Sequence, residues 1–286
     1  MNERDGSEQA SLYEASSAGG EQPAQAFRLR ELWDRRQPMI GGWLSIPSTL
    51  SAEVMAATGF DWVCIDTQHG LIGYEAMTAM LQALDARGAP TFVRVPWNEP
   101  SSIQKALDAG ADGVIVPMVG SAAEAEAAVR ACRYPPLGYR SWGPVRASLR
   151  TPGYDPETAN RGLLCVVMVE TVEGVEHVDE IASTAGVDGI LIGPWDLSLS
   201  STHGVETPGD KESDLELIET VLAACERHGI VAGIASPTAA HLIRWAGMGF
   251  RFFQLSGDVP FLSGAARSTL AQARAGLRES AVVGEG

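Results

Sequence analysis

Lysine is almost missing from this chain, which has two lysines among its 286 residues. Lys105 falls in a predicted helix and Lys211 in a charged loop, so neither follows a predicted strand. Enzymes that form a Schiff base need a desolvated lysine in the pocket. The sequence therefore disfavours Schiff-base chemistry and leaves the role of electron sink to a metal ion.

Cysteine is also scarce, and no two cysteines form a C-x-x-C pair. The four are Cys64, Cys132, Cys165 and Cys225. Two of them fall inside predicted strands, where a thiol behaves as a small apolar group. This usage of cysteine favours a reducing compartment, and we expect a cytoplasmic location.

Long apolar runs and excess positive charge are absent as well. No stretch approaches the roughly 18–20 apolar residues that span a bilayer, and the N-terminus has no apolar signal-peptide run. The net charge of −15 argues against nucleic acid and against anionic membrane surfaces as partners. The sequence also has no phosphate-binding P-loop. We therefore expect small-molecule partners.

The length and the apolar content of 45% fit one large α/β domain. Residues 1–27 are rich in Ser, Ala, Gly, Glu and Gln, and we expect a disordered tail there. Residues 28–280 are expected to form a single domain.

A short sequence motif recurs four times along the chain: a glycine turn, a short apolar run, and then a residue that could take part in catalysis or binding. The turns lie at 58–61, 109–112, 185–188 and, more loosely, 247–250. Buried parallel strands read as continuous apolar runs rather than as alternations. In barrels and open α/β sheets, the chemistry lies where such strands end.

Strands and helices are predicted to alternate along residues 28–280. The predicted strands are 40–46, 61–66, 90–95, 112–117, 163–170, 188–193, 230–235 and 250–256. The predicted helices are 28–36, 50–58, 74–86, 100–109, 121–132, 173–184, 213–227, 237–246 and 259–278. This alternation predicts a (β/α)₈ TIM barrel. A doubly wound open sheet is the alternative, but no G-x-G-x-x-G follows the first strand.

Two carboxylates follow neighbouring strands of the predicted barrel. Glu170 ends the fifth strand, and Asp196 follows the sixth in Gly193-Pro194-Trp195-Asp196. Two carboxylates held close repel each other unless a proton or a cation lies between them, and oxygen ligands suit Mg²⁺ or Mn²⁺. The alternative is that each carboxylate only caps a helix.

Polar groups also end the second and third strands. Asp66 precedes His69 by three residues, and a nearby carboxylate can raise the basicity of an imidazole. A hydrogen-bonded loop histidine is the alternative. Arg94 must pair with an anion, which is either a substrate carboxylate or an internal partner such as Asp66. Trp43 ends the first strand and either walls a pocket or fills the core.

A proline- and arginine-rich connection spans 133–162. Its prolines are expected to stiffen it as a lid or as an arm that reaches another subunit. Arg140 and Arg146 could add positive charge there. A plain surface loop is the alternative.

The motifs in this order resemble those of the metal-dependent (class II) HpcH/HpaI aldolases. The resemblance covers about residues 41–273. The matching motifs are G-x-W with Trp43, I-D-x-x-H with Asp66 and His69, V-R with Arg94, R-Y-P-P-x-G-x-R from Arg133, E-T with Glu170, and G-P-x-D-L-S with Asp196.

The resemblance implies a role for each of these positions. Glu170 and Asp196 would bind the divalent ion, Mg²⁺ or Mn²⁺ with Co²⁺ as a further option. Arg94 and the main-chain N–H groups around Trp195 and Asp196, in the turn that begins with Gly193 and Pro194, would hold a pyruvyl carboxylate. Asp66 and His69 would form an acid/base dyad, and Trp43 would line the pocket.

The resemblance also implies an activity and an assembly. The enzyme would cleave and form 4-hydroxy-2-oxo acids, giving pyruvate (or a substituted 2-oxo acid) and an aldehyde through a metal-stabilised enolate. It would be a homo-oligomer, a hexamer or trimer of dimers, with the last helix near 259–278 swapped between subunits. Three departures bear on the substrate: Gln68 in place of Glu, Trp195 in place of a small residue, and Met168 in place of a polar one.

Three alternative functions remain open. An oxaloacetate decarboxylase would use the same enolate, and a citramalyl- or malyl-type CoA-ester lyase would use a related barrel. The lyase would need a surface for the CoA nucleotide, and the chain has no basic cluster beyond Arg140 and its neighbours. A catalytically silent barrel that only binds a metabolite is the non-enzymatic alternative.

Overall fold

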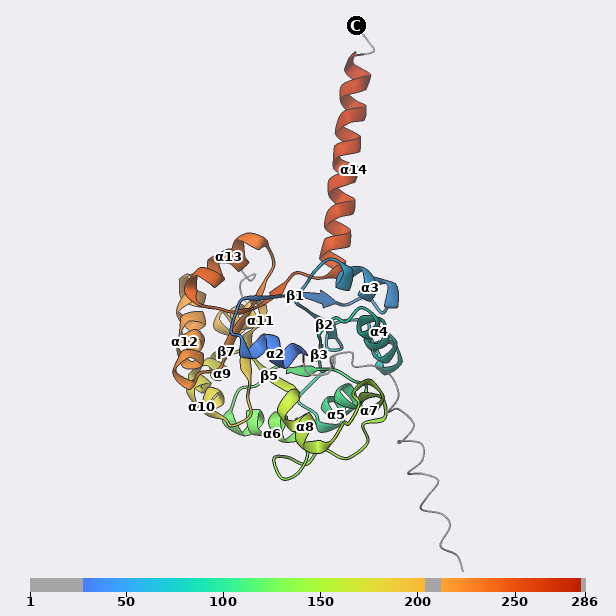
Figure 1. The fold of residues 1–286 in the computed structure, drawn as a ribbon. Coiled ribbons are helices and arrows are strands. Elements are labelled where there is room, and N and C mark those ends of the chain that lie inside the picture. The colour runs from blue at the N-terminus through green and yellow to red at the C-terminus, as the bar shows by residue number, and fades with distance from the viewer. Residues whose placement is uncertain (1–27, 204–211, 284–286) are drawn as a thin grey trace, which may run out of the picture.

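Eight parallel strands close into a barrel in which each strand pairs with its neighbours in chain order and β8 pairs with β1 (Figure 1). The computed structural model describes residues 28–203 and 212–283, so the predicted tail at 1–27 and Lys211 lie outside the described residues. The strands are β1 (Met39–Leu44), β2 (Trp62–Asp66), β3 (Thr91–Arg94), β4 (Gly113–Val116), β5 (Leu164–Val169), β6 (Gly189–Ile192), β7 (Val231–Ser236) and β8 (Phe252–Leu255). The predicted (β/α)₈ barrel is confirmed.

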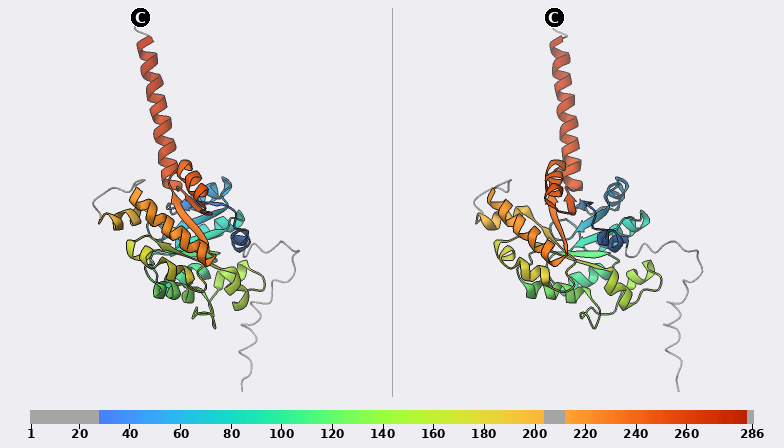
Figure 2. Two further views of the ribbon diagram at one scale, coloured as in Figure 1. Left: turned by 90° about the vertical axis from the view of Figure 1, so that its left-hand side faces the viewer. Right: turned by 60° about the vertical axis from the view of Figure 1, so that its left-hand side comes forward.

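Helices surround the barrel, and one helix leaves it. They are α2 (Arg28–Asp34), α3 (Thr49–Ala57), α4 (Tyr74–Ala86), α5 (Pro100–Asp108), α6 (Ala122–Cys132), α7 (Val145–Arg150), α8 (Pro156–Gly162), α9 (Val172–Glu176), α10 (Val178–Ser183), α11 (Pro194–Ser201), α12 (Glu212–His228), α13 (Ala239–Met248) and α14 (Asp258–Val283). Figures 1 and 2 show α14 projecting away from the barrel in every view. In the described part of the chain, no helix is both long and apolar enough to cross a membrane.

One predicted helix and one predicted connection differ from the structure. The helix expected at 173–184 is interrupted at His177, which separates α9 from α10. The connection at 133–162 contains two short helices, α7 and α8, each of which starts beside a proline. Proline removes a backbone donor and fixes φ, so it suits the first turn of a helix.

The recurring glycine turns have the backbone conformation that requires glycine. Each turn contains one glycine with positive φ: Gly59 (94°), Gly110 (98°), Gly186 (94°) and Gly249 (125°). Only glycine adopts this region without steric cost. Each turn passes the chain from a helix into the next strand, so the repeat marks the amino ends of β2, β4, β6 and β8.

Aromatic rings fill the amino end of the barrel interior. Trp62 and Phe252 stack with their ring centroids 4.3 Å apart, and Trp33 of α2 packs edge-on against Phe252 at 4.9 Å. Gly41 makes room for this layer, because a Cβ there would overlap the Trp62 ring. The barrel is therefore packed at its amino end, and chemistry is left to the carboxyl end.

The arginines of the 133–162 connection form internal ion pairs. Arg140 is fully buried, lies 2.6 Å from Asp108 and stacks over the Tyr134 ring. Arg146 pairs with Asp85 and donates to the carbonyl of Ala109 at 2.6 Å. These partners lie beside the turn that enters β4 at its amino end. The structure therefore does not place this connection as a lid over the carboxyl end of its own barrel.

Candidate active site at the carboxyl end of the barrel

Asp66 and Arg94 are the last residues of β2 and β3, and the strand register pairs them directly. Arg94 Nε donates to Asp66 Oδ1 at 2.9 Å, and Arg94 Nη2 donates to Oδ2 at 2.6 Å. Both residues are buried. The internal ion pair that the sequence left open is therefore formed, while the second guanidinium nitrogen, Nη1, has no partner in the described structure.

Trp43 supports this pair from β1. Its indole Nε1 donates to Asp66 Oδ2 at 3.1 Å, and its ring lies 4.9 Å from the Arg94 guanidinium carbon. Burial would raise the pKa of Asp66, but the hydrogen bonds from Arg94 and Trp43 and the charge of Arg94 lower it. Asp66 is thus held as a carboxylate. Trp43 is buried and contacts Asp66 and Arg94, so its ring packs in the core and also forms part of the site's wall.

His69 lies on the loop that follows Asp66. The Asp66 carboxylate accepts the backbone N–H groups of Gln68 at 3.0 Å and His69 at 3.2 Å. The His69 side chain is exposed, and its ring makes no hydrogen bond among the described residues. The carboxylate therefore orders the loop that carries the imidazole rather than bonding to the ring itself.

Glu170 follows β5 and is buried, with 1% of its surface exposed. Its Oε1 accepts the backbone N–H of Met118 at 2.8 Å. Burial raises the pKa of Glu170 to about 7, and the nearby charge of Asp196 adds to this rise. Thr171, not Glu170, caps α9, because Thr171 Oγ1 accepts the N–H of Gly174 at 3.0 Å. The alternative in which Glu170 only caps this helix is therefore wrong.

Asp196 lies in the first turn of α11, which begins at Pro194 directly after β6. Gly193 precedes this helix, and a Cβ at position 193 would overlap Glu170 Oε2. The chain turn from 193 to 196 therefore passes against the Glu170 carboxylate. Trp195 is 47% exposed beside Asp196. The two predicted carboxylates lie close enough for the charge of one to perturb the other.

The donor set at this point suits a hard divalent cation. Glu170 Oε2 accepts no hydrogen bond among the described residues, and the Asp196 carboxylate adds a second set of oxygens nearby. In the described part of the chain, no three His, Cys, Asp or Glu side chains gather closely enough to hold an ion by themselves. Two carboxylates with open positions fit Mg²⁺ or Mn²⁺, which keep waters or substrate oxygens as ligands. The residues present therefore fit such an ion.

Met118 is a site residue that the sequence reasoning assigned no role. It follows β4 with φ of 56°, a conformation that is uncommon for residues other than glycine. That conformation accompanies its N–H bond to Glu170. Backbone strain of this kind gathers at functional sites. The sequence signal was the proline at 117 directly after the apolar run, which marked the strand end without revealing the donor.

Comparison with known proteins identifies related sequences. The family described as HpcH/HpaI aldolase/citrate lyase matches residues 39–262. A hydroxypyruvate/pyruvate aldolase of Rhizorhabdus wittichii is 39% identical over 252 residues, which is 87% of this chain and 99% of that protein. A 4-hydroxy-2-oxo-heptane-1,7-dioate aldolase of Klebsiella pneumoniae is 36% identical over 82% of this chain and 89% of that protein.

A solved structure shares the fold as well. The crystal structure of a family protein from Burkholderia cenocepacia superposes with a TM-score of 0.80 at 34% identity. It covers 85% of this chain and 99% of that one. Since the family match spans most of the barrel and the relatives align over nearly their whole length, the chain belongs to the HpcH/HpaI aldolase/citrate lyase family.

Proposed function

We propose that the protein uses a divalent cation, Mg²⁺ or Mn²⁺, to cleave and form 4-hydroxy-2-oxo acids. Its family and its aldolase-named relatives make it a carbon–carbon lyase. The products are pyruvate, or a substituted 2-oxo acid, and an aldehyde. The name hydroxypyruvate/pyruvate aldolase on a 39% identical relative supports hydroxypyruvate as such a substituted donor.

One observation carries the proposal: the buried Glu170 carboxylate lies beside the turn that carries Asp196, and its pKa is raised to about 7. Holding a buried carboxylate close to a second, partly exposed one is costly unless a proton or a cation lies between them. A divalent cation held by Glu170 and Asp196 would supply the Lewis acidity that stabilises an enolate.

The chain's own residues then bind and orient the substrate. Arg94 is fixed by Asp66 and keeps a guanidinium nitrogen available for a substrate carboxylate. The backbone N–H groups of Trp195 and Asp196 lie in the first turn of α11, where they have no intrahelical acceptor. They suit the oxygens of the same carboxylate.

Proton movement falls to His69. In cleavage, the C3–C4 bond breaks, the proton of the 4-hydroxyl passes to the His69 imidazole directly or through water, and C3 of the enolate is later protonated. Asp66 takes part in this step by ordering the loop of His69 through its backbone N–H. We expect the exposed Trp195 and the partly buried Gln68, which lie beside Asp196 and His69 in the chain, to influence which aldehyde is accepted.

The test measures pyruvate release from 4-hydroxy-2-oxo acids with and without EDTA, followed by addition of Mg²⁺ or Mn²⁺. We expect loss of activity on chelation and recovery on addition of metal. Undiminished turnover in metal-free protein would overturn the cation's role. Release of CO₂ from oxaloacetate without any aldol cleavage would instead favour the decarboxylase. The CoA-ester lyase gains no support from Arg140, whose guanidinium is buried against Asp108.

The assembly proposal is a homohexamer, or trimer of dimers, in which α14 packs on a neighbouring subunit. α14 projects away from its own barrel and exposes large apolar side chains, among them Leu262, Leu270 and Leu277. Light scattering of the full chain, compared with a chain that ends at residue 257, tests it. We expect the shortened chain to form an assembly of fewer subunits than the full chain does. We also place the protein in the cytoplasm, where its four buried free cysteines would stay reduced.

A further inference from the structure

The amino end of the barrel repeats one hydrogen bond at three of its glycine turns. The aspartate at the end of each turn accepts the backbone N–H of the first or second residue of the preceding strand. These bonds are Ile40 N–H to Asp61 (2.8 Å), Thr91 N–H to Asp112 (2.9 Å) and Cys165 N–H to Asp188 (2.7 Å). Two of these aspartates also pair with arginines, Asp112 with Arg150 and Asp188 with both Arg30 and Arg133.

The fourth turn reverses the charge at this position. Arg251 stands where the other copies have aspartate, directly before β8. Its Nη1 donates to the backbone carbonyls of Phe250 at 2.8 Å and Ala246 at 3.3 Å. No carboxylate forms an ion pair with Arg251 in the described part of the chain. The half-buried guanidinium thus lacks the counter-charge that the equivalent ion pairs have.

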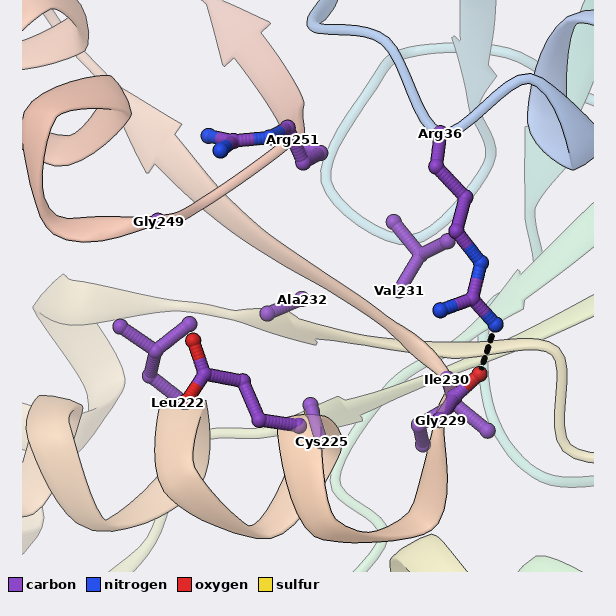
Figure 3. Close-up of a pocket in the computed structure, with 10 residues that line it drawn as sticks. Arg36, Leu222, Cys225, Gly229, Ile230, Val231, Ala232, Gly249 and Arg251 are labelled. Atoms are coloured by element: carbon purple, nitrogen blue, oxygen red, sulfur yellow. Dashed lines mark hydrogen bonds between the residues drawn. The ribbon is translucent and has the colours of Figure 1, made fainter.

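A cavity of about 250 Å³ opens beside Arg251 (Figure 3). Apolar residues line the cavity between Arg36 and Arg251, among them Leu222, Val231 and Ala232. Figure 3 shows Arg251 on one side of this wall and Arg36 on the other. The cavity lies at the amino ends of β7 and β8, so the length of the barrel separates it from Glu170 and Arg94.

Arg36 is held at the cavity by an unusual backbone. Its φ is 52°, in the left-handed region that is sterically unfavourable for a residue other than glycine. Its Nη2 donates to the carbonyl of Gly229, and the remaining guanidinium nitrogens have no partner among the described residues. Arg36 therefore offers a second cationic group to the same cavity.

Glu226 is the carboxylate that lines this cavity, and it forms no ion pair with either arginine. The lining therefore keeps a net positive charge in a chain of net charge −15. An adjoining cavity is also lined by Arg36, together with Asp34 and with Arg30, which pairs with Asp188 at 2.8 Å. Of these two cavities, Arg251 lines the first and not the second, so the first combines two arginines that have no carboxylate partner among the described residues.

We propose that this cavity is a second binding site, which takes a small aliphatic carboxylate. The carboxylate group binds Arg251, the aliphatic chain lies on Val231 and Ala232, and a second carboxylate, where the ligand has one, reaches Arg36. This site is independent of the proposed catalysis, because it lies at the opposite end of the barrel from the aldolase residues.

The test is calorimetric titration of the full-length protein with adipate and pentanoate, with inorganic phosphate as a non-aliphatic anion. We expect adipate to bind best, and Arg251→Gln to weaken it about tenfold or more through loss of a charged hydrogen bond. Arg36→Gln should weaken adipate more than pentanoate. Glu226→Gln should strengthen both about threefold by removing a like charge.

Two control variants locate the binding. Arg94→Gln at the catalytic end and Arg267→Gln on exposed α14 should leave the affinity unchanged. A loss of binding in Arg94→Gln, or wild-type affinity in Arg251→Gln, would overturn the proposal, as would no heat from wild type at ligand concentrations up to about 20 mM. Melting temperatures check folding, and the exposed Arg36 provides a second variant if Arg251→Gln unfolds the protein.

Discussion

The Asp66 carboxylate grips the Arg94 guanidinium along one edge, through Nε at 2.9 Å and Nη2 at 2.6 Å. This arrangement leaves Nη1 available and removes the rotational freedom that a long arginine side chain otherwise has. Because the two residues end adjacent strands, the barrel itself sets the direction of the free edge. A substrate carboxylate would meet a group already fixed in place, which lowers the entropic cost of binding.

Breaking this pair is expected to destabilise the protein. Asp66→Ala leaves a buried guanidinium and the Trp43 indole N–H without their acceptor, so we expect a loss of about 3 kcal/mol in the free energy of unfolding. Urea denaturation measures it. Asp179→Ala serves as the matched control, because Asp179 pairs with Arg227 at 2.7 Å on the surface, where both side chains are more than half exposed. Equal midpoints for the two variants would contradict the role given to Asp66.

Glu170→Gln is expected to weaken cation binding strongly while keeping the fold. The amide oxygen can still accept the Met118 N–H, but the negative charge and one ligand oxygen are lost. Titration with Mn²⁺ should show at least about a hundredfold weaker affinity, and turnover should fall at least as much. Glu173→Gln, three residues away on the exposed side of α9, is the control and should match wild type. Tight Mn²⁺ binding by Glu170→Gln would remove Glu170 from the metal site.

The metal-free protein is expected to lose stability as pH rises from about 4.5 to about 7. The folded-state pKa of Glu170 is raised to about 7 by burial, from an ordinary value near 4.5, so the folded state binds more protons in this window. The unfolding free energy should therefore fall across it, by at most about 3 kcal/mol. Urea titrations in EDTA at pH 5 and pH 7.5 measure the change. Glu170→Gln should show a smaller decrease, and added Mg²⁺ should reduce the decrease in wild type, because a cation favours the charged carboxylate. A flat profile for the metal-free wild type would contradict the prediction.

Gly193→Ala is expected to inactivate the enzyme through a steric effect on Glu170. The φ of Gly193 is −96°, so alanine strains no backbone, but its Cβ would overlap Glu170 Oε2 and displace the carboxylate. We expect turnover to fall by about two orders of magnitude, since small misplacement of a catalytic group is costly. Gly276→Ala on α14 is the matched control, because nothing lies within 4 Å of its position. It should retain activity and gain helix stability. An active Gly193→Ala enzyme would show that the Glu170 position is not critical.

The sequence predicted the barrel because its local signals agree with one another. The glycine turns require positive φ at Gly59, Gly110 and Gly186, and the apolar runs after them are buried strands. Because all the barrel strands are parallel, their carboxyl ends bring Asp66, Arg94 and Glu170 to one end of the barrel. These placements depend on the order of the strands along the chain and on the positions where the apolar runs end, and both can be read from a single sequence.

Contacts between distant segments were not predictable in the same way. Whether Arg94 faces a substrate or Asp66 depends on the register of β2 against β3, which no local pattern encodes. The N–H of Met118 reaches Glu170 across 52 residues of chain. The sequence left open whether the 133–162 connection is a lid, an arm to another subunit or a surface loop. The ion pairs of its arginines with Asp108 and Asp85 depend on the return of this connection to the amino end of the barrel, which no local pattern shows.

The aspartates that tie adjacent strands together at the glycine turns have an evolutionary consequence. They link neighbouring strands by hydrogen bonds at the amino end of the barrel, opposite the proposed active site. Exposed residues at the opposite end, such as Trp195, therefore contribute less to holding the strands together than the buried Asp66–Arg94 pair does. We therefore expect substitutions at an exposed position such as 195 to change which aldehyde the enzyme accepts with little loss of fold stability. Related enzymes could then evolve new substrate preferences without first acquiring stabilising substitutions.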